Sequence, residues 1–141
     1  MVLMKTRSAK SKGRRLQNLL VQRLLETFPH FKPADLRPAL MSEGGMDVKL
    51  STAARSNIPY AFEAKNREAI NMWESIKQAE ANANQENLTP AVVISRNRLP
   101  EPYVAVPLKV FLRLIYSEWL HQKVCGTVRC TDVDTTLCPQ N

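Results

Sequence analysis

The chain has 141 residues, 44% of them hydrophobic and 23% charged, which is typical of a globular protein with one compact domain. Its apolar stretches are short and interrupted by charges, and no apolar stretch follows the basic N-terminus before Leu16, so neither a membrane span nor a secretory signal is predicted. The net charge of +7 favours an anionic partner, and we expect a cytoplasmic location.

The first part of the chain is basic, since no acidic residue precedes Glu26. Residues 1–11 are rich in Ser and Lys and predict a flexible basic arm, which either stays solvated or contacts phosphates. Residues 12–28 have apolar positions at helical spacing, with Ser11 as the expected N-cap and Pro29 as the terminator. The residues expected on the inner face of this helix are Leu16, Leu19, Leu20, Leu24 and Phe28.

Three strands are predicted next, over residues 39–42, 46–50 and 58–65. The two glycines at 44–45 indicate a turn, and the polar residues 51–57 indicate a loop. Together the three strands predict an antiparallel meander.

Two further helices and two further strands complete the predicted fold. A helix is expected over residues 67–86, a buried central strand over 91–94, another strand over 103–106 and a last helix over 107–122. The residues expected to face inward on these helices are Ile70, Trp73, Ile76, Leu108, Phe111, Leu112, Ile115 and Trp119. The order of elements predicts an α/β (α+β) fold in which helices flank a mixed central β-sheet.

The predicted organisation is therefore a basic arm (1–11), a single domain (12–122) and a C-terminal tail or extension (123–141). The three cysteines, Cys125, Cys130 and Cys138, lie in the last part of the chain, and no CxxC pair is present. This pattern favours free thiols over a zinc site.

Three ionisable residues are expected on one side of two neighbouring strands. Glu63 and Lys65 are two positions apart, so a strand directs both to the same face, and Asp47 follows the glycine turn on the preceding strand. The apolar residues that alternate with them, and should pack into the core, are Val48, Leu50, Phe62 and Ala64.

Two carboxylates and an ammonium group at one site are what metal-dependent phosphodiester hydrolysis requires. Mg²⁺ and Mn²⁺ prefer hard oxygen ligands. A lysine beside the ion can orient or deprotonate the attacking water, or stabilise the charged transition state. We therefore predict Mg²⁺ or Mn²⁺ as the cofactor, with no organic cofactor.

The sequences Gly45-Met46-Asp47-Val48 and Phe62-Glu63-Ala64-Lys65 resemble the PD-(D/E)xK nuclease superfamily, in the branch of archaeal Holliday-junction resolvases and small phage endonucleases. The basic start of the first helix at 12–15, the helix after the motif and the apolar strand that follows also fit, so that the resemblance covers residues 12–115. It implies a restriction-endonuclease-like fold, and a small protein of this type is compatible with a phage-encoded enzyme that acts in the host cytoplasm.

The resemblance also assigns roles to residues. Asp47 and Glu63 would be metal ligands together with the carbonyl of Ala64, and Asp47, Glu63 and Lys65 would form the catalytic centre. The chain departs from the family at Gln17, because the resolvases usually carry a glutamate on the first helix. The auxiliary candidates at the site are Gln17, Glu43 and Gln78.

Basic and polar residues around this site are candidates for contacts with the DNA backbone, although each is also compatible with an ordinary solvated surface. They are Lys12, Arg14, Arg15, Arg55, Asn66, Arg67, Arg96 and Arg98.

The predicted function is a metal-dependent endodeoxyribonuclease that selects branched or duplex DNA by structure and acts as a homodimer. The last predicted helix is the candidate dimer surface. One alternative is a nicking, homing-type or single-strand nuclease of the same chemistry. The other is a non-catalytic DNA-binding protein that retains the fold.

Overall fold

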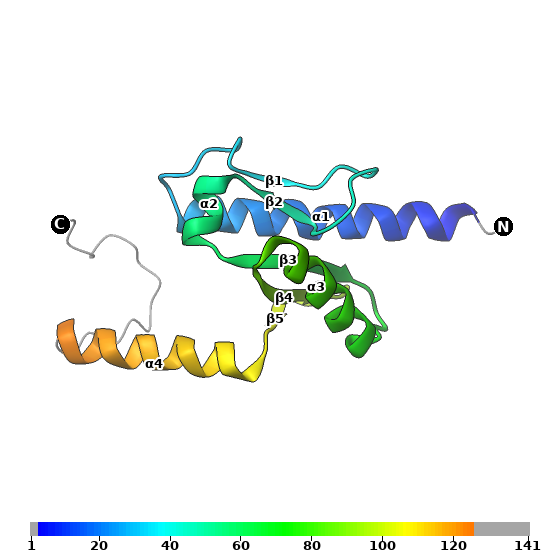
Figure 1. The fold of residues 1–141 in the computed structure, drawn as a ribbon. Coiled ribbons are helices and arrows are strands. Elements are labelled where there is room, and N and C mark those ends of the chain that lie inside the picture. The colour runs from blue at the N-terminus through cyan, green and yellow to red at the C-terminus, as the bar shows by residue number, and fades with distance from the viewer. Residues whose placement is uncertain (1–2, 126–141) are drawn as a thin grey trace. The chain divides into compact units, whose positions relative to one another are not determined.

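The computed structural model describes residues 3–125, which form an α+β arrangement (Figure 1). Two compact units divide the chain, one ending at Pro107 and one beginning at Leu108. The predicted single domain over 12–122 is thus divided within its last strand–helix connection. The elements of the first unit are α1 (Leu3–Thr27), β1 (Leu36–Pro38), β2 (Val48–Leu50), α2 (Thr52–Asn57), β3 (Tyr60–Asn66), α3 (Met72–Glu86), β4 (Thr89–Ser95) and β5 (Tyr103–Ala105).

Helix α1 is longer than the sequence predicts. It begins at Leu3, so residues 3–11 are helical where a flexible arm was expected, and Ser11 lies inside the helix and does not cap it. Leu, Met, Lys, Arg and Ala all favour helix, and no proline interrupts this segment. The helix ends at Thr27, because the residue before Pro29 is disfavoured from helical geometry.

The expected three-stranded meander is reduced to one antiparallel pair. Strand β1 pairs with β2 in the register Leu36↔Leu50, and β1 lies earlier in the chain than the predicted strand over 39–42. The segment after β2 was expected to be a loop but forms α2, whose N-cap Ser51 accepts a hydrogen bond from Ala54 N. This helix redirects the chain, so β3 joins a different sheet from β2.

The central sheet is mixed, with the order β3-β4-β5, as the sequence predicted for the sheet type. Strands β3 and β4 are parallel in the register Lys65↔Ile94, and β5 is antiparallel to β4. A parallel pair needs a crossover connection, and α3 supplies it. This helix begins after the N-cap Asn71 and ends at Asn87, whose φ of 53° is the left-handed conformation that terminates helices.

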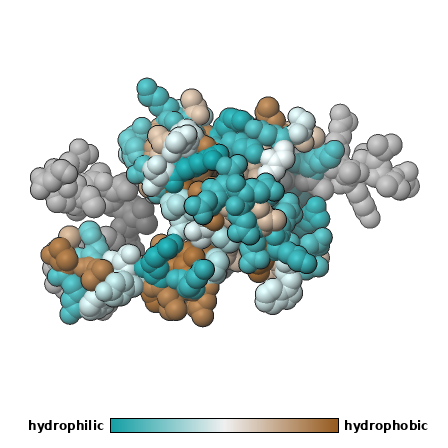
Figure 2. Space-filling view, viewed as in Figure 1, coloured by the Kyte–Doolittle hydropathy of each residue, from teal (hydrophilic) through white to brown (hydrophobic). Residues whose placement is uncertain are grey.

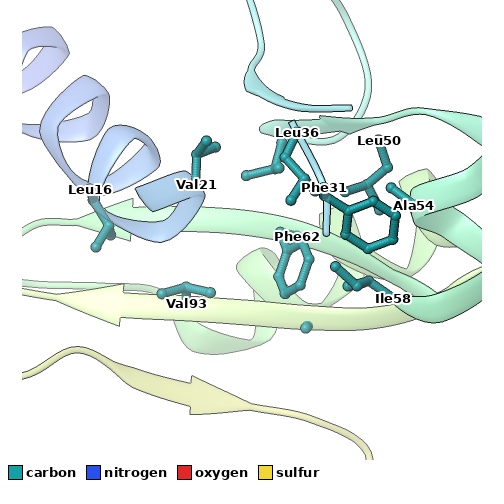
Figure 3. Packing of buried hydrophobic residues seen from close by; sticks show 11 residues of the cluster. Leu16, Val21, Phe31, Leu36, Leu50, Ala54, Ile58, Phe62 and Val93 are labelled. Atoms are coloured by element: carbon teal, nitrogen blue, oxygen red, sulfur yellow. The ribbon is translucent and has the colours of Figure 1, made fainter. Parts of the chain in front are cut away.

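One face of the β3–β4 pair packs against α1. The alternation along β3 directs Phe62 to the same cluster as Leu16 and Val21 of α1, and Val93 of β4 joins them (Figure 3). The residues buried or packed in this cluster include all five that the sequence predicted for the inner face of the first helix. Val48 and Leu50 also lie in it, as expected.

The opposite face of the pair packs against α3, through small residues. The buried positions of this helix are Ser75, Ala79 and Ala83, whose spacing of four residues places them on one side. Trp73, predicted to face inward, is 81% exposed. The two other residues predicted to face inward, Ile70 and Ile76, are half-buried. The sequence did not indicate the buried positions because the side chains that contact the sheet are small or polar.

The second unit contains α4 (Leu108–Cys125) among its described residues. The predicted helix is present, but the side chains expected to face inward are exposed, and Figure 2 shows apolar residues at the surface along α4. These exposed side chains are Leu108, Phe111, Leu112, Ile115 and Trp119. Among the helices of residues 3–125, none has the length and apolar character needed to cross a bilayer. Cys125 is a free thiol, and the predictions for Cys130 and Cys138 lie outside the described residues.

Candidate active site

Asp47 lies directly before β2 and is held against the edge of β3. Its backbone N–H donates to the carbonyl of Phe62 at 2.9 Å, and its Oδ2 accepts from the N–H of Ala64 at 2.7 Å. These two bonds straddle Glu63 and fix the aspartate next to it. The side chain of Asp47 is therefore positioned by backbone groups, which a mobile surface carboxylate would not be.

Glu63 and Lys65 point to the same face of β3, as the alternation predicted. Lys65 Nζ lies 2.7 Å from Glu63 Oε1 and donates to Gln78 Oε1 at 2.9 Å. Asn82 Nδ2 donates to the other oxygen of Glu63 at 3.4 Å. Glu63 is only 2% exposed, so this ion pair is largely withdrawn from water. The structure thus brings Asp47, Glu63 and Lys65 together.

The electrostatics of the site disfavour two ionised carboxylates. Burial raises the pKa of Asp47, although the Ala64 N–H and the charge of Lys65 oppose the shift. Burial also raises the pKa of Glu63, and the negative charge of Asp47 raises it further, against the lowering effect of Lys65. One lysine only partly compensates for the negative charges of a buried and a half-buried carboxylate, so an additional cation would stabilise the ionised pair.

The donor set fits a magnesium-type ion. Within residues 3–125, no cluster of three His, Cys, Asp or Glu side chains is arranged to bind a metal. Mg²⁺ typically binds through one or two carboxylates and completes its shell with water and substrate phosphates. Asp47 and Glu63 supply such a pair.

Gln17 and Gln78 are both at the site, as predicted. Gln17, on α1, donates from Nε2 to Asp47 Oδ1 at 2.7 Å, while Gln78, on α3, holds Lys65. With these bonds every oxygen of Asp47 and Glu63 has a donor. Asn82 was missed by the sequence reasoning. Its position one helical turn after Gln78, on the same side of α3, is the signal that indicates it.

Glu43 is not brought to this site. Its carboxylate forms a two-pronged ion pair with Arg37, with both N–O distances at 2.9 Å, and accepts from Leu40 N at 3.0 Å. These bonds, led by Arg37, lower the pKa of Glu43 to about 2. The prediction of an auxiliary role is therefore replaced by a structural one, since Glu43 closes the turn before β2.

Part of the basic set does lie beside the site. Asn66, directly after Lys65, donates from its amide to the carbonyl of Lys12 at 3.1 Å, which ties the basic start of the predicted first helix to the end of β3. Arg67 comes directly after β3, and its backbone N–H donates a hydrogen bond to the carbonyl of Ser95 at 3.1 Å. Arg96 comes directly after Ser95. The parallel strands β3 and β4 therefore end together, in polar and basic residues.

The other basic candidates have different positions. Arg55 pairs with Glu86 at the far end of α3 and bonds the Leu50 carbonyl, so the structure does not bring it to the carboxylates. Arg14 bonds the carbonyl of Ala39. Arg15 is exposed on α1, and Arg98 is exposed in a turn with a φ of 63°.

Comparison with known proteins adds no relative. No protein-family model, no curated protein and no solved structure matches the chain. The geometry of the site is therefore the basis on which a function is proposed.

Proposed function

We propose that this protein is an Mg²⁺- or Mn²⁺-dependent endodeoxyribonuclease whose catalytic residues are Asp47, Glu63 and Lys65. The observation that carries the proposal is the triad itself, in which Glu63 is buried and Asp47 and Lys65 are half-buried. Two carboxylates with raised pKa values share one face with a lysine whose ammonium group is held by Glu63 and Gln78. Perturbed carboxylates beside a single positioned lysine are typical of active sites.

A purely structural ion pair would not need this arrangement. A second carboxylate beside Glu63 destabilises the fold when ionised, and the protein nonetheless fixes Asp47 there with two backbone hydrogen bonds. Such local destabilisation is common where binding a ligand relieves it.

In the proposed mechanism, Asp47 and Glu63 would hold the cation, and the Ala64 carbonyl would be a further ligand. The bound ion would make water more acidic and offset the negative charge that grows on the phosphate. Lys65 would place its ammonium group toward the attacking water and the phosphate oxygens, and would deliver or accept a proton at Nζ. Gln78 would orient Lys65, and Gln17 would orient Asp47.

The substrate proposed is DNA, branched or duplex, held by its phosphates. Lys12, Arg67 and Arg96 surround the carboxyl ends of β3 and β4, next to Lys65. Contacts from such residues position the backbone without determining sequence, which favours selection by DNA structure. We further propose that the first unit, a mixed sheet between α1 and α3, is a restriction-endonuclease-like domain.

We propose that the enzyme is a homodimer through α4. A stripe of large exposed side chains, Leu108, Leu112, Ile115 and Trp119, recurs every three or four residues along this helix. That spacing is the pattern of a helix that pairs with another helix.

The charges beside the stripe favour a second copy as the partner. Glu118 and Lys123 flank the stripe on opposite sides, at the spacing that brings unlike charges together across a parallel pair of identical helices. Replacing Ile115 by Asp should convert the dimer to a monomer in sedimentation velocity, whereas Ser117→Asp, on the opposite side of α4, should leave it dimeric. A wild-type protein that sediments as a monomer would contradict the dimer.

The nuclease is tested with the wild-type protein, Lys65→Ala and the control Lys77→Ala, whose lysine is exposed on α3. Four-way-junction, linear duplex and single-stranded DNA are each incubated with Mg²⁺, Mn²⁺ or EDTA. We expect metal-dependent cutting that falls by about 10²- to 10³-fold in Lys65→Ala, as for the loss of one transition-state donor, and is unchanged in Lys77→Ala. DNA binding without cutting under any metal would instead indicate a non-catalytic binding protein.

A further inference from the structure

Two hollows lie side by side at the carboxyl ends of β3 and β4, next to the triad. The first has a volume of about 270 Å³, and its wall includes Lys65 and Gln78. The second, of about 350 Å³, includes Arg96 and Tyr103. Arg67 and Ile70 line both hollows, so the two hollows adjoin. Together we call them the groove, which starts at Lys65.

The two ends of this groove differ in chemistry. The end at Lys65 is polar, with Asn71, Ser75 and Gln78 in its wall. The end at Tyr103 is lined by apolar side chains, Ile70, Ile94 and Leu99, together with two arginines. A polar, cationic end beside an apolar end with an aromatic ring matches a nucleotide, which has an anionic phosphate and a flat base.

The groove offers groups that the fold itself does not use. Within residues 3–125, neither Arg67 nor Arg96 forms a salt bridge, whereas Arg23, Arg37 and Arg55 each pair with a glutamate. Tyr103 is 65% exposed on the edge strand β5, although aromatic rings usually bury much of their surface. An exposed tyrosine flanked by unpaired guanidinium groups is the combination that binds unpaired bases by stacking.

Two acidic residues limit what the groove can hold. Glu68 and Glu74 also lie in its walls, and Glu68 accepts a hydrogen bond from the backbone N–H of Asn97 at 2.9 Å. These carboxylates nearly balance the arginines. The groove therefore suits a ligand held by stacking as well as charge, and suits a free phosphate ion less well.

We infer that this groove binds an unpaired nucleotide of the DNA strand, with its base against Tyr103 and its phosphate near Arg67, adjacent to the phosphate that is cut. The inference rests on the proposed nuclease function and narrows its substrate. DNA with an unstacked base near the cleavage point, as at a junction, flap or single strand, is the substrate class that fits. Uninterrupted duplex does not present a free base to the tyrosine.

The test measures binding of a labelled DNA strand by fluorescence anisotropy in EDTA, once as a single strand and once annealed into blunt duplex. Tyr103→Ala should weaken single-strand binding by about 5- to 100-fold, as for the loss of one base–aromatic stack, and should change duplex binding little. Tyr103→Phe keeps the ring and should bind as the wild type does. Val104→Ala, at the neighbouring exposed position on β5, is the matched control and should have no effect.

A second variant provides an independent measurement. Arg67→Ala should reduce the slope of the logarithm of single-strand affinity against the logarithm of salt concentration by roughly one, as for the loss of one phosphate contact. Equal loss of single-strand and duplex binding in Tyr103→Ala, or no loss, would overturn the proposed nucleotide site, as would an unchanged salt slope in Arg67→Ala. Thermal melting of each variant establishes that it is folded.

The groove and the nuclease fail in different ways. Metal-dependent cutting of junctions that is indifferent to Tyr103→Ala overturns the groove and leaves the nuclease. Single-strand binding that depends on Tyr103, in a protein that cuts nothing, supports the groove and overturns the nuclease.

Discussion

Two glutamates in this protein each pair with a cation, and they behave in opposite ways. Glu43 lies at the surface, where Arg37 and the Leu40 N–H lower its pKa to about 2. Glu63 is 2% exposed, and its pKa is raised although Lys65 lies 2.7 Å away. The ion-pair distances are similar, so the environment decides the difference.

The comparison separates a structural ion pair from a candidate catalytic one. At the surface, water and the guanidinium stabilise the carboxylate, and the pair closes a turn. In the interior, removing water from the Glu63 carboxylate raises its pKa more than the interaction with one ammonium group lowers it. The second carboxylate, Asp47, adds repulsion and raises the pKa further. A buried carboxylate that remains undercompensated is suited to bind a further cation.

Metal binding gives the largest expected contrast between the two glutamates. Glu63→Gln should weaken Mn²⁺ binding by at least about 10- to 100-fold, because loss of groups that merely support a metal ligand already has that effect. Glu43→Gln should bind Mn²⁺ as the wild type does. Isothermal titration calorimetry measures both, and equal affinities in the two variants would remove Glu63 from the site.

The amide of Gln17 should matter to a lesser degree. Gln17→Glu would replace the hydrogen bond to Asp47 Oδ1 by a contact between two carboxylates. The metal-free protein should lose about 2 kcal/mol of unfolding free energy, the typical contribution of a hydrogen bond to a charged group. Mn²⁺ should restore the loss, because the third carboxylate is a further ligand. Urea unfolding with and without Mn²⁺ tests this, and a loss that the ion does not reverse would place the cation elsewhere.

Removing the charge of Asp47 should stabilise the metal-free protein modestly. In Asp47→Asn the amide oxygen can still accept from Ala64 N, and its NH₂ group can donate to Gln17 once the Gln17 amide turns over. The burial that raises the pKa of Asp47 no longer acts against a charge. Thermal melting should show a midpoint a few degrees higher than the wild type in EDTA and no increase on adding Mn²⁺. A lower midpoint in EDTA would show that the ionised form is favoured.

The smallest effect expected is a difference in pH dependence. The folded pKa of Glu43, about 2, lies below its ordinary value of 4.5, so its contribution to stability is complete above pH 4.5 and is lost as the pH falls toward 2. The ionisation of Glu63 affects the stability in the opposite direction. Its folded pKa is raised, so the unfavourable effect of its ionisation is absent below pH 4.5 and grows as the pH rises through the raised value.

Variants of the two residues should therefore diverge with pH in urea unfolding of the metal-free protein. Glu43→Gln should be less stable than the wild type at neutral pH and should approach it as the pH falls below 4.5. The free energy of unfolding of Glu63→Gln should increase relative to that of the wild type as the pH rises. Parallel curves for both variants would mean that the two glutamates share one environment.

Local patterns predicted the triad because alternation along a strand is a local property. Glu63 and Lys65 had to share a face of β3, and the apolar run at 91–94 had to be buried, whatever the rest of the fold. The same reasoning failed for α3, where Ser75, Ala79 and Ala83 are buried and Trp73 is exposed. Hydrophobicity alone does not indicate how closely a helix approaches a sheet.

The sequence by itself determined three of the four helices of the described residues, the mixed sheet type and which residues carry the proposed chemistry. Only the tertiary structure decided that β3 pairs in parallel with β4, that Glu43 pairs with Arg37, and that Gln17 holds Asp47 whereas Gln78 holds Lys65. The physical reason is the distance along the chain over which each interaction acts. Spacing along the chain fixes the direction of a side chain within one element, whereas the partner that it meets depends on packing between elements far apart in sequence.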